Sequence, residues 1–286
     1  MPIPIQLSVA LITRNRPDSL ARALASIRAQ SRQPYEVLVS DNSDLDYAGA
    51  IAALAQQWDC RYLLAPVQGM YPNRNFAATQ CRGTHIHTMD DDHVWPAGHL
   101  EKCFGALERD RQAIWTTGER GFIDGEFFAH VTRANQLSPS GVGIGITNPD
   151  DNWGIADGST IYPRAVFDRG FRLLENFGGY GAIYLEFGAY LYQQGFKSRS
   201  IPGAYVEHYA DRSILTRRPL SMYRSRLYAS LAYNRYFRPH RGRLLRYGLT
   251  YSWHLRRSHN PVTYLPQVWS AVAHRWGRPR PSDAHP

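Results

Sequence analysis

Three consecutive carboxylates, Asp90, Asp91 and Asp92, stand in the segment HTMDDDHVWP and could together hold a cation. They follow His85 to Met89, a short run that predicts a β-strand. Adjacent carboxylates repel one another, so their position at a strand end favours a bound positive charge. Mg²⁺ and Mn²⁺ prefer carboxylate oxygen, which makes the triplet a candidate metal anchor. The alternative is a solvated acidic turn that caps the next helix. Residues two apart on an extended chain face the same way, which would pair Asp90 with Asp92.

An alternation of strands and helices must position these carboxylates. Branched apolar runs predict strands, and helical spacing of Leu20, Leu24 and Ile27 predicts the first helix. The expected strands are 5–12, 35–44, 61–66 and 84–92, with helices at 18–30, around 51–54 and at 73–83. Four strand–helix repeats in about 90 residues predict an α/β fold with a mostly parallel sheet flanked by helices.

Polar clusters follow the predicted strands where a parallel sheet places its ligand crevice, at the carboxyl ends. Thr13, Arg14 and Asn15 follow the first strand, and 41–44 (Asp-Asn-Ser-Asp) ends the second. Together with the triplet after the fourth strand, they predict one site.

The pattern becomes irregular from about Ala113. The glycine-spaced segment 140–154 does not lie between a strand and a helix, so a loop or bulged strand is expected instead of a phosphate loop. Residues 185–194 predict a helix, and 197–208 predict a short strand that leads to His208.

The composition is that of a folded intracellular protein. The 286 residues are 43% hydrophobic and 13% aromatic, enough for a substantial core. No apolar stretch reaches 18 residues, and the N-terminus has the pattern of a first strand instead of a signal peptide. Cys60, Cys81 and Cys103 form no CxxC, which favours a reducing, cytoplasmic location with all three as core residues. His85 and His87 share a strand face; zinc ligation lacks further His/Cys spacing, so packing is the preferred interpretation.

The positive charge is concentrated in the C-terminal quarter. The net charge is +9, yet residues 216–286 contain fourteen arginines, no lysine and one acidic residue, interleaved with aromatics. Such a helical segment could bind nucleic acid, dock on an anionic membrane, or pack on the rest of the chain with a solvated arginine face. We favour association with a membrane, at its inner face, or with an acidic partner, and consider nucleic acid unlikely.

The ordered set of motifs in residues 5–212 resembles the family-2 glycosyltransferases of the GT-A fold. The segments that carry the resemblance are TRNRPDSLARALASI, YEVLVSDNSD, GMYPNRNFAATQCRGTHIHTMDDDH, GSTIYPRAVFDRGFR and YVEHYADRS. It implies a GT-A domain at 1–215, with a nucleotide-binding half at 1–112 and an acceptor-binding half at 113–215, followed by a basic aromatic extension at 216–286.

The resemblance also implies a donor and a metal. The donor would be a nucleoside-diphosphate sugar, and Mn²⁺ or Mg²⁺ would stabilise the charge of its departing diphosphate. Motif distances counted to Pro96 and Leu100 match Asp91 and Asp92 to the family's acidic pair. We therefore expect Asp92 as the main metal ligand and Asp91 as a ribose or metal-water contact, with His208 completing the metal site.

The nucleotide-binding residues implied by the resemblance lie at the strand ends. Asp41 would accept the N3–H of uracil or thymine, which favours UDP- or dTDP-sugars. Arg74 and Asn75 match the family's Arg-Asn pair, and Arg74 could pair with phosphate. The nucleoside pocket would be completed by Thr13, Arg14, Asn15, Asp90 and Asp91.

The main departure from the family's pattern is the absence of its usual Glu-Asp pair. That pair supplies the base for the acceptor hydroxyl. Counted back from Gly195, its positions hold Ile183 and Tyr184. Glu186, two positions later, and Asp157 are the remaining candidates for the base, unless the acceptor is activated differently. The alternative for Glu186 is a helix residue that pairs with an arginine. A lipid-linked or polysaccharide acceptor is expected.

Two other functions remain open from the sequence. A non-catalytic nucleotide-sugar binding protein is suggested by the missing base. A nucleotidyltransferase also uses acidic metal ligands on an α/β sheet, but TRNRPDS lacks the Gly-rich loop typical of that class.

Overall fold

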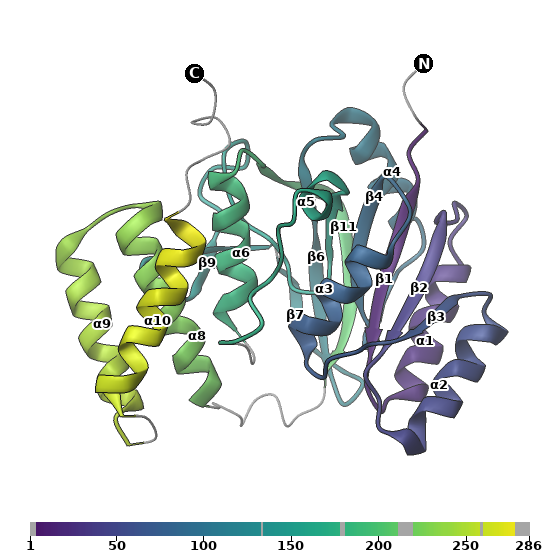
Figure 1. Ribbon diagram of the computed structural model, residues 1–286. Helices are drawn as coiled ribbons and strands as arrows, with labels where there is room; N and C mark the ends of the chain where they lie inside the picture. The colour runs from purple at the N-terminus through teal and green to yellow at the C-terminus, as the bar shows by residue number, and fades with distance from the viewer. Residues whose placement is uncertain (1–3, 133, 178–180, 211–219, 258–259, 278–286) are drawn as a thin grey trace. The chain divides into compact units, whose positions relative to one another are not determined.

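The structure is a computed structural model that describes all residues except 1–3, 133, 178–180, 211–219, 258–259 and 278–286 (Figure 1). The chain divides into two compact units. Unit 1 comprises 1–134, 156–173 and 199–217, and unit 2 comprises 135–155, 174–198 and 218–286. The predicted boundary near residue 215 therefore does not separate an independent extension from a single N-terminal domain, because 218–286 share a unit with two earlier segments.

Unit 1 is built on the predicted parallel sheet. Its strands are β1 (Leu7–Thr13), β2 (Glu36–Asp41), β3 (Arg61–Leu64) and β4 (His85–Asp90), in the spatial order β3-β2-β1-β4. All seven side chains of β1 are buried. This explains the continuous apolar run in the sequence, because a parallel sheet is covered on both faces.

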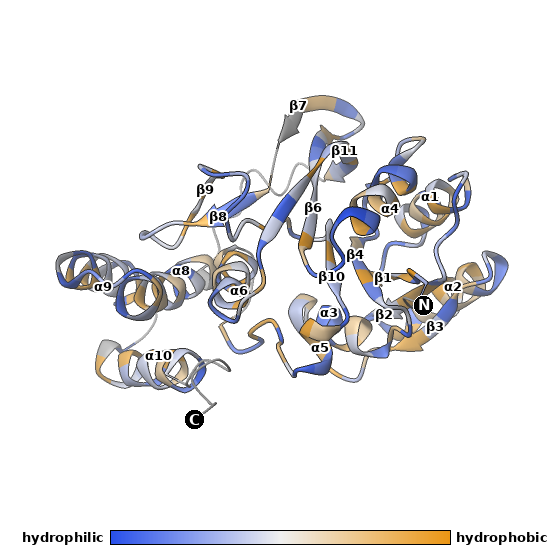
Figure 2. Cartoon of the chain, turned by 90° about the horizontal axis from the view of Figure 1, so that it is seen from above, coloured by the Kyte–Doolittle hydropathy of each residue, from blue (hydrophilic) through white to orange (hydrophobic). Residues whose placement is uncertain are grey.

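Helices cover the two faces of this sheet. They are α1 (Pro17–Arg28), α2 (Leu45–Gln57), α3 (Met70–Gln80), α4 (His99–Arg109) and the short α5 (Ala165–Asp168). Seen from above, α1 and α4 lie on one side of the sheet and α3 and α5 on the other (Figure 2). The α/β class and the flanking helices were both predicted correctly.

Antiparallel strands extend the sheet beyond β4. β10 (Thr160–Pro163) pairs with β4 and with β6 (Ile114–Ile123), and β7 (Glu126–Thr132) pairs with β6. β11 (Ser198–Ala210) and the two-residue β5 (His93–Val94) complete the order β10-β6-β11-β5. In the β5–β11 pair, His93 lies opposite His208. Part of the irregular pattern after Ala113 is thus the antiparallel portion of one mixed sheet.

Unit 2 is mainly helical. It contains α6 (Ala182–Gln193), α8 (Leu220–Ala232), the π-helical turn η1 (Tyr233–Phe237), α9 (Arg241–Leu255) and α10 (Pro261–Trp276), with a small hairpin of β8 (Asn135–Leu137) and β9 (Gly143–Gly145). Of this hairpin, β9 lies in the glycine-spaced segment 140–154, which was expected to be a loop or bulged strand. Among the described helices, none combines the length and apolar character needed to cross a membrane.

Candidate active site

The strand register brings the predicted polar clusters to one edge of the sheet in unit 1. Thr13 at the end of β1 is paired with Asp41 at the end of β2, and Ile12 is paired with Asp90 at the end of β4. The Thr13 hydroxyl donates a 2.7 Å hydrogen bond to Asp91 Oδ2. The first strand end and the aspartate triplet are therefore in direct contact, as predicted.

The three aspartates face different partners, because β4 ends at Asp90 and the next two residues form a turn. Asp90 contacts Arg74, whereas Asp91 and Asp92 share Arg16. The alternation that would pair Asp90 with Asp92 requires an extended chain, and the strand ends at Asp90. The two neighbours that share a partner are instead Asp91 and Asp92, the pair expected from the motif distances. Burial raises the pKa of Asp91 to about 7 even though Arg16 opposes the shift.

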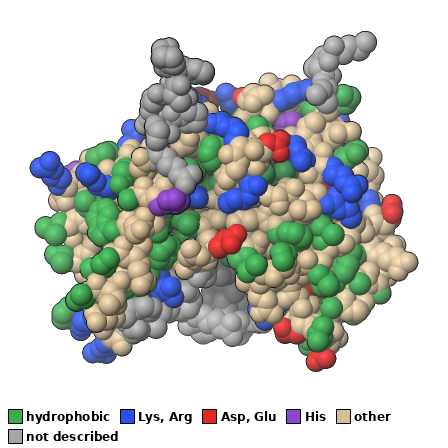
Figure 3. Space-filling model, in the orientation of Figure 1, with side chains coloured by type: hydrophobic (Ala, Val, Ile, Leu, Met, Phe, Trp, Pro, Cys, Tyr) green, Lys and Arg blue, Asp and Glu red, His purple; other side chains and the backbone are tan. Residues whose placement is uncertain are grey.

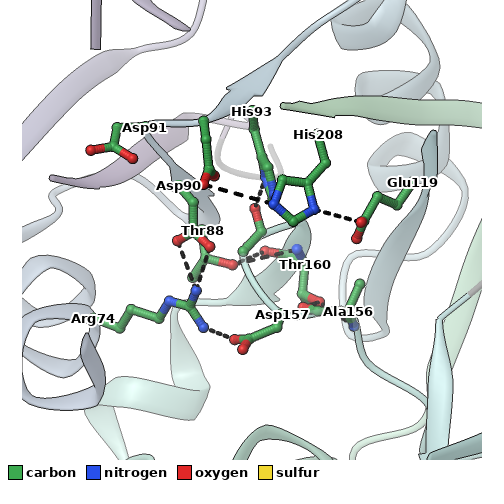
Figure 4. A network of polar contacts seen from close by, with 12 residues as sticks. Arg74, Thr88, Asp90, Asp91, His93, Glu119, Ala156, Asp157, Thr160 and His208 are labelled. Atoms are coloured by element: carbon green, nitrogen blue, oxygen red, sulfur yellow. Dashed lines mark hydrogen bonds and ion pairs between the residues drawn. The ribbon is translucent and has the colours of Figure 1, made fainter. Parts of the chain in front are cut away.

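Arg74 is buried between two carboxylates (Figure 4). Its Nη2 donates to both oxygens of Asp90, at 2.7 and 2.6 Å, and its Nη1 forms an ion pair with Asp157. Gly158 has a φ of +72°, and a Cβ there would lie 2.6 Å from Asp90 Oδ2. Both terminal nitrogens of the Arg74 guanidinium are thus paired with carboxylates of the protein itself, which does not fit the expectation that Arg74 pairs with a phosphate.

Asp92, His93 and His208 form a cluster of ligand atoms that lie within 4.8 Å of one another. His93 Nδ1 lies 3.1 Å from the Gly158 carbonyl, and His208 Nδ1 lies 2.6 Å from Glu119 Oε1. Since a carbonyl or carboxylate oxygen accepts, each Nδ1 carries a proton and each Nε2 is directed elsewhere. His208 Nε2 lies 3.7 Å from Asp92 Oδ2.

This cluster fits a divalent metal ion. Metal-binding histidines usually donate their other ring N–H to a carbonyl or carboxylate, as both rings do here. Asp92 Oδ1 is buried and accepts no hydrogen bond within the described part of the chain. Burial lowers the pKa of His208, but the neighbouring carboxylates of Asp92 and Glu119 outweigh it and raise the pKa to about 10. The surroundings of His208 therefore favour positive charge.

The residues expected to bind the nucleoside differ in burial and in hydrogen-bond partners. Asp41 is buried and accepts hydrogen bonds from the Tyr62 hydroxyl and the Ser43 backbone N–H, at 2.9 and 2.8 Å. Arg14 is half exposed and lies 3.5 Å from Asp44, to which Asn15 also donates a hydrogen bond. These residues line the same edge of the sheet.

Two predicted site residues do not fit their roles. Asn75 is buried and exchanges two hydrogen bonds with the backbone of Leu173, at 2.8 and 2.9 Å, which is a structural contact. Glu186 lies on α6 in unit 2, is 0% exposed, and accepts from Arg275 Nε at 2.9 Å and from the Trp276 indole at 2.7 Å. Burial raises the pKa of Glu186, while Arg275 and Trp276 oppose the shift. A carboxylate enclosed in this way cannot reach an acceptor hydroxyl.

Three residues of the site were not predicted: Arg16, His93 and Glu119. Arg16 follows the first strand and His93 follows the triplet directly, so proximity to both motifs could have identified them. Glu119 has no local signal, because it meets His208 only through the pairing of distant strands.

Known proteins share parts of this sequence. The family described as "Glycosyl transferase family 2" matches residues 8–171. Over 104 residues the chain is 26% identical to "Uncharacterized glycosyltransferase YwdF" of Bacillus subtilis (strain 168), a match that covers 36% of this chain and 39% of that relative.

Solved structures share the fold. GalNAc-T7, crystallised with UDP, GalNAc and Mn²⁺, superposes with a TM-score of 0.62 at 14% identity, over 72% of this chain and 43% of that one. S. aureus TarS 1–349 superposes with a TM-score of 0.61 at 14% identity, over 95% and 80% of the two chains. The same TarS fragment in complex with UDP gives a TM-score of 0.60 at 15% identity, over 91% and 74%. These similarities identify the GT-A fold.

Proposed function

The chain belongs to glycosyl transferase family 2, and from this premise we propose that it is a metal-dependent glycosyltransferase. It would move a sugar from a nucleoside-diphosphate sugar to an acceptor hydroxyl. The observation that carries the proposal is the cluster of Asp92, His93 and His208. It lies at the edge of the sheet where β1 ends with Thr13 and β2 ends with Asp41.

The proposed metal ligands are Asp92, His93 and His208. Two imidazoles beside one carboxylate favour Mn²⁺ over Mg²⁺, because Mg²⁺ is usually held by carboxylate, phosphate and water oxygens. When bound, the metal would supply positive charge to the departing diphosphate. His93 and His208 are already oriented by Gly158 and Glu119, so little reorganisation is needed.

The proposed donor is a UDP-sugar, with a dTDP-sugar as the alternative. Asp41 is the carboxylate that could accept the N3–H of uracil or thymine, although it now accepts from Tyr62 and Ser43. UDP in the solved TarS and GalNAc-T7 structures supports the same choice.

Asp157 is the proposed base. It lies beside Asp90 in unit 1 and its side chain is 27% exposed. Its ion pair with buried Arg74 fixes its position, and its exposure leaves it accessible to an acceptor hydroxyl.

A non-catalytic nucleotide-sugar binding protein is the second candidate function. It is favoured by Ile183 and Tyr184 at the family's Glu-Asp positions and by the enclosure of Glu186. Hydrolysis or transfer of a bound donor by the purified protein separates the two functions, since only an enzyme turns the donor over.

Calorimetry with UDP and Mn²⁺ tests the proposal. We expect UDP to bind in a Mn²⁺-dependent manner, and Asp92→Asn to weaken binding by a factor of about 10 to 100. Asp168→Asn is the matched control, because Asp168 is an exposed carboxylate on α5 that pairs with Arg164. If Asp92→Asn bound UDP with Mn²⁺ as tightly as the control, the metal site would be wrong.

We further propose that α9 docks on an anionic membrane surface, where a lipid-linked acceptor would be found. Leu245, Leu249 and Trp253 recur at four-residue spacing and are 65%, 63% and 64% exposed. Figure 3 shows hydrophobic side chains gathered over α9, with Lys and Arg side chains at their margin. An exposed apolar face bordered by arginines has the character of an interfacial helix.

Flotation with vesicles tests the membrane proposal. The protein should float with vesicles that contain phosphatidylglycerol but not with pure phosphatidylcholine, and high salt should weaken binding. Leu249→Glu should abolish flotation, whereas Leu64→Glu, at an equally exposed leucine on β3, should not. Equal flotation of both variants would contradict the assignment to α9.

A further inference from the structure

A second group of metal-ligating side chains lies within unit 1, apart from the candidate active site. His87 on β4 meets His99 and Cys103 of α4, and all three are 0% exposed. Their ligand atoms lie within 4.8 Å of one another. His99 and Cys103 are four residues apart on one helix face. The sequence interpretation assigned His87 and Cys103 to packing, because the contact between β4 and α4 is not visible in the local spacing.

Hydrogen bonds fix the tautomer of both imidazoles. His87 Nδ1 lies 2.8 Å from the Thr88 carbonyl oxygen, and His99 Nδ1 lies 3.0 Å from the Tyr205 carbonyl oxygen. A carbonyl oxygen only accepts, so both Nδ1 atoms carry protons. In a neutral ring the remaining nitrogen, Nε2, then presents a lone pair.

The two Nε2 atoms face each other at 3.3 Å. A hydrogen bond between them would need a second proton on one ring, and burial opposes that charge. Both rings are fully buried, where an ionised group is costly unless it is paired. Two lone pairs directed at each other inside the core repel, unless a cation lies between them.

We propose that His87, His99 and Cys103 bind a thiophilic cation, Zn²⁺ or Cu⁺. Two nitrogens on a tetrahedral zinc ion, each about 2.0–2.1 Å from the metal, are about 3.3–3.4 Å apart, which matches the observed separation. The Cys103 sulfur supplies the soft ligand that these ions select.

The surroundings of the cluster complete the argument. Each histidine donates its other N–H to a backbone carbonyl, the usual outer contact of a metal-binding imidazole. The Trp95 ring stacks on His99 at 4.8 Å and 19°, and its centroid lies 4.8 Å from that of His87. A buried aromatic wall excludes water. A metal here would connect α4 to the strand that ends in the aspartate triplet.

Cobalt substitution tests this site separately from the active site. Protein purified without chelator should contain about one equivalent of zinc or copper, and elemental analysis identifies which. Replacing the metal by Co²⁺ should give the near-ultraviolet charge-transfer absorption of a thiolate–cobalt bond, which the sulfur-free cluster of Asp92, His93 and His208 cannot produce.

Variants assign the absorption to Cys103. Cys103→Ser and His99→Ala should lose it, whereas Cys60→Ser and Asp92→Asn should keep it. If a variant fails to fold, chelation of the wild-type protein provides the readout: the melting temperature should fall and be restored by zinc. A wild-type protein with less than about a tenth of an equivalent of metal and no thiolate–cobalt absorption would overturn the proposal.

Discussion

Arg16 bridges Asp91 and Asp92, the two adjacent carboxylates of the candidate active site. Its Nη1 lies 2.8 Å from Asp92 Oδ2, its Nε lies 3.2 Å from Asp91 Oδ2, and its Nη2 forms an ion pair with Asp91. The side chain is 49% exposed, so the guanidinium can leave toward solvent. Arg16 thus neutralises the charge that a bound cation would also neutralise.

Removing Arg16 should therefore tighten metal binding. Arg16→Ala removes a positive charge that competes with the metal ion for Asp92. We therefore expect the affinity for Mn²⁺ to rise by up to about tenfold. Calorimetric titration with Mn²⁺ measures the effect. Arg22→Ala, at an α1 arginine that donates to Ser19, is the control. Weaker Mn²⁺ binding in Arg16→Ala alone would show that Arg16 supports the metal site instead.

Asp90 should matter for stability, because it balances a buried guanidinium. Asp90→Ala leaves Arg74 with Asp157 alone, and removing one partner of a buried pair costs about 3–5 kcal/mol. Asp168→Ala breaks the exposed pair with Arg164 and should cost less than about 1 kcal/mol. Urea unfolding gives both values. Similar losses of unfolding free energy in the two variants would mean that the buried pair of Arg74 and Asp90 stabilises the protein no more than an exposed pair does.

Gly158 tests how closely the backbone must approach Asp90. Gly158→Ala adds a Cβ at 2.6 Å from Asp90 Oδ2 to a residue with φ of +72°. Gly125→Ala is the matched control, because φ there is +83° and nothing lies within 4 Å of the added carbon. The control isolates the cost of the left-handed conformation, about 1–2 kcal/mol. Gly158→Ala should lose measurably more on thermal unfolding and should also weaken Mn²⁺ binding.

Asp157 should control turnover more than donor binding. If it is the base, Asp157→Asn should lower kcat by a factor of about 10² to 10⁴ while UDP affinity with Mn²⁺ changes little. Kinetics with the donor and calorimetry with UDP separate the two quantities. A variant with wild-type kcat would remove Asp157 from the mechanism.

Glu186 should be a structural residue. Glu186→Ala leaves Arg275 buried without its carboxylate and should cost about 3–5 kcal/mol in unfolding free energy. Turnover per folded molecule should nevertheless stay near the wild-type value. Asp151→Asn, at the half-exposed carboxylate paired with Lys197 in the same unit, is the control. A large loss of turnover in folded Glu186→Ala would restore the role of base.

The sequence was most informative where structure is local. β1, β2 and β4 and the helices between them follow from apolar periodicity, and the strand ends collect Thr13, Asp41 and Asp90 because parallel strands end together. The resemblance to family-2 glycosyltransferases supplied the GT-A fold, which the comparisons confirm.

Pairing between distant strands could not be predicted in the same way. His93 meets His208 through the antiparallel pairing of β5 and β11, which no local pattern encodes. His87 meets His99 and Cys103 only because α4 packs beside β4. Glu186 was kept as a candidate base because an isolated helix sequence does not reveal that Arg275 and Trp276 enclose its carboxylate.

The pair of Glu186 and Arg275 has a consequence for synthesis on the ribosome. The two residues are 89 positions apart, and unit 2 is assembled from three separate stretches of chain. When α6 leaves the exit tunnel, the arginine that balances its carboxylate has not yet been translated. Unit 2 therefore cannot finish folding until the chain has emerged as far as Arg275.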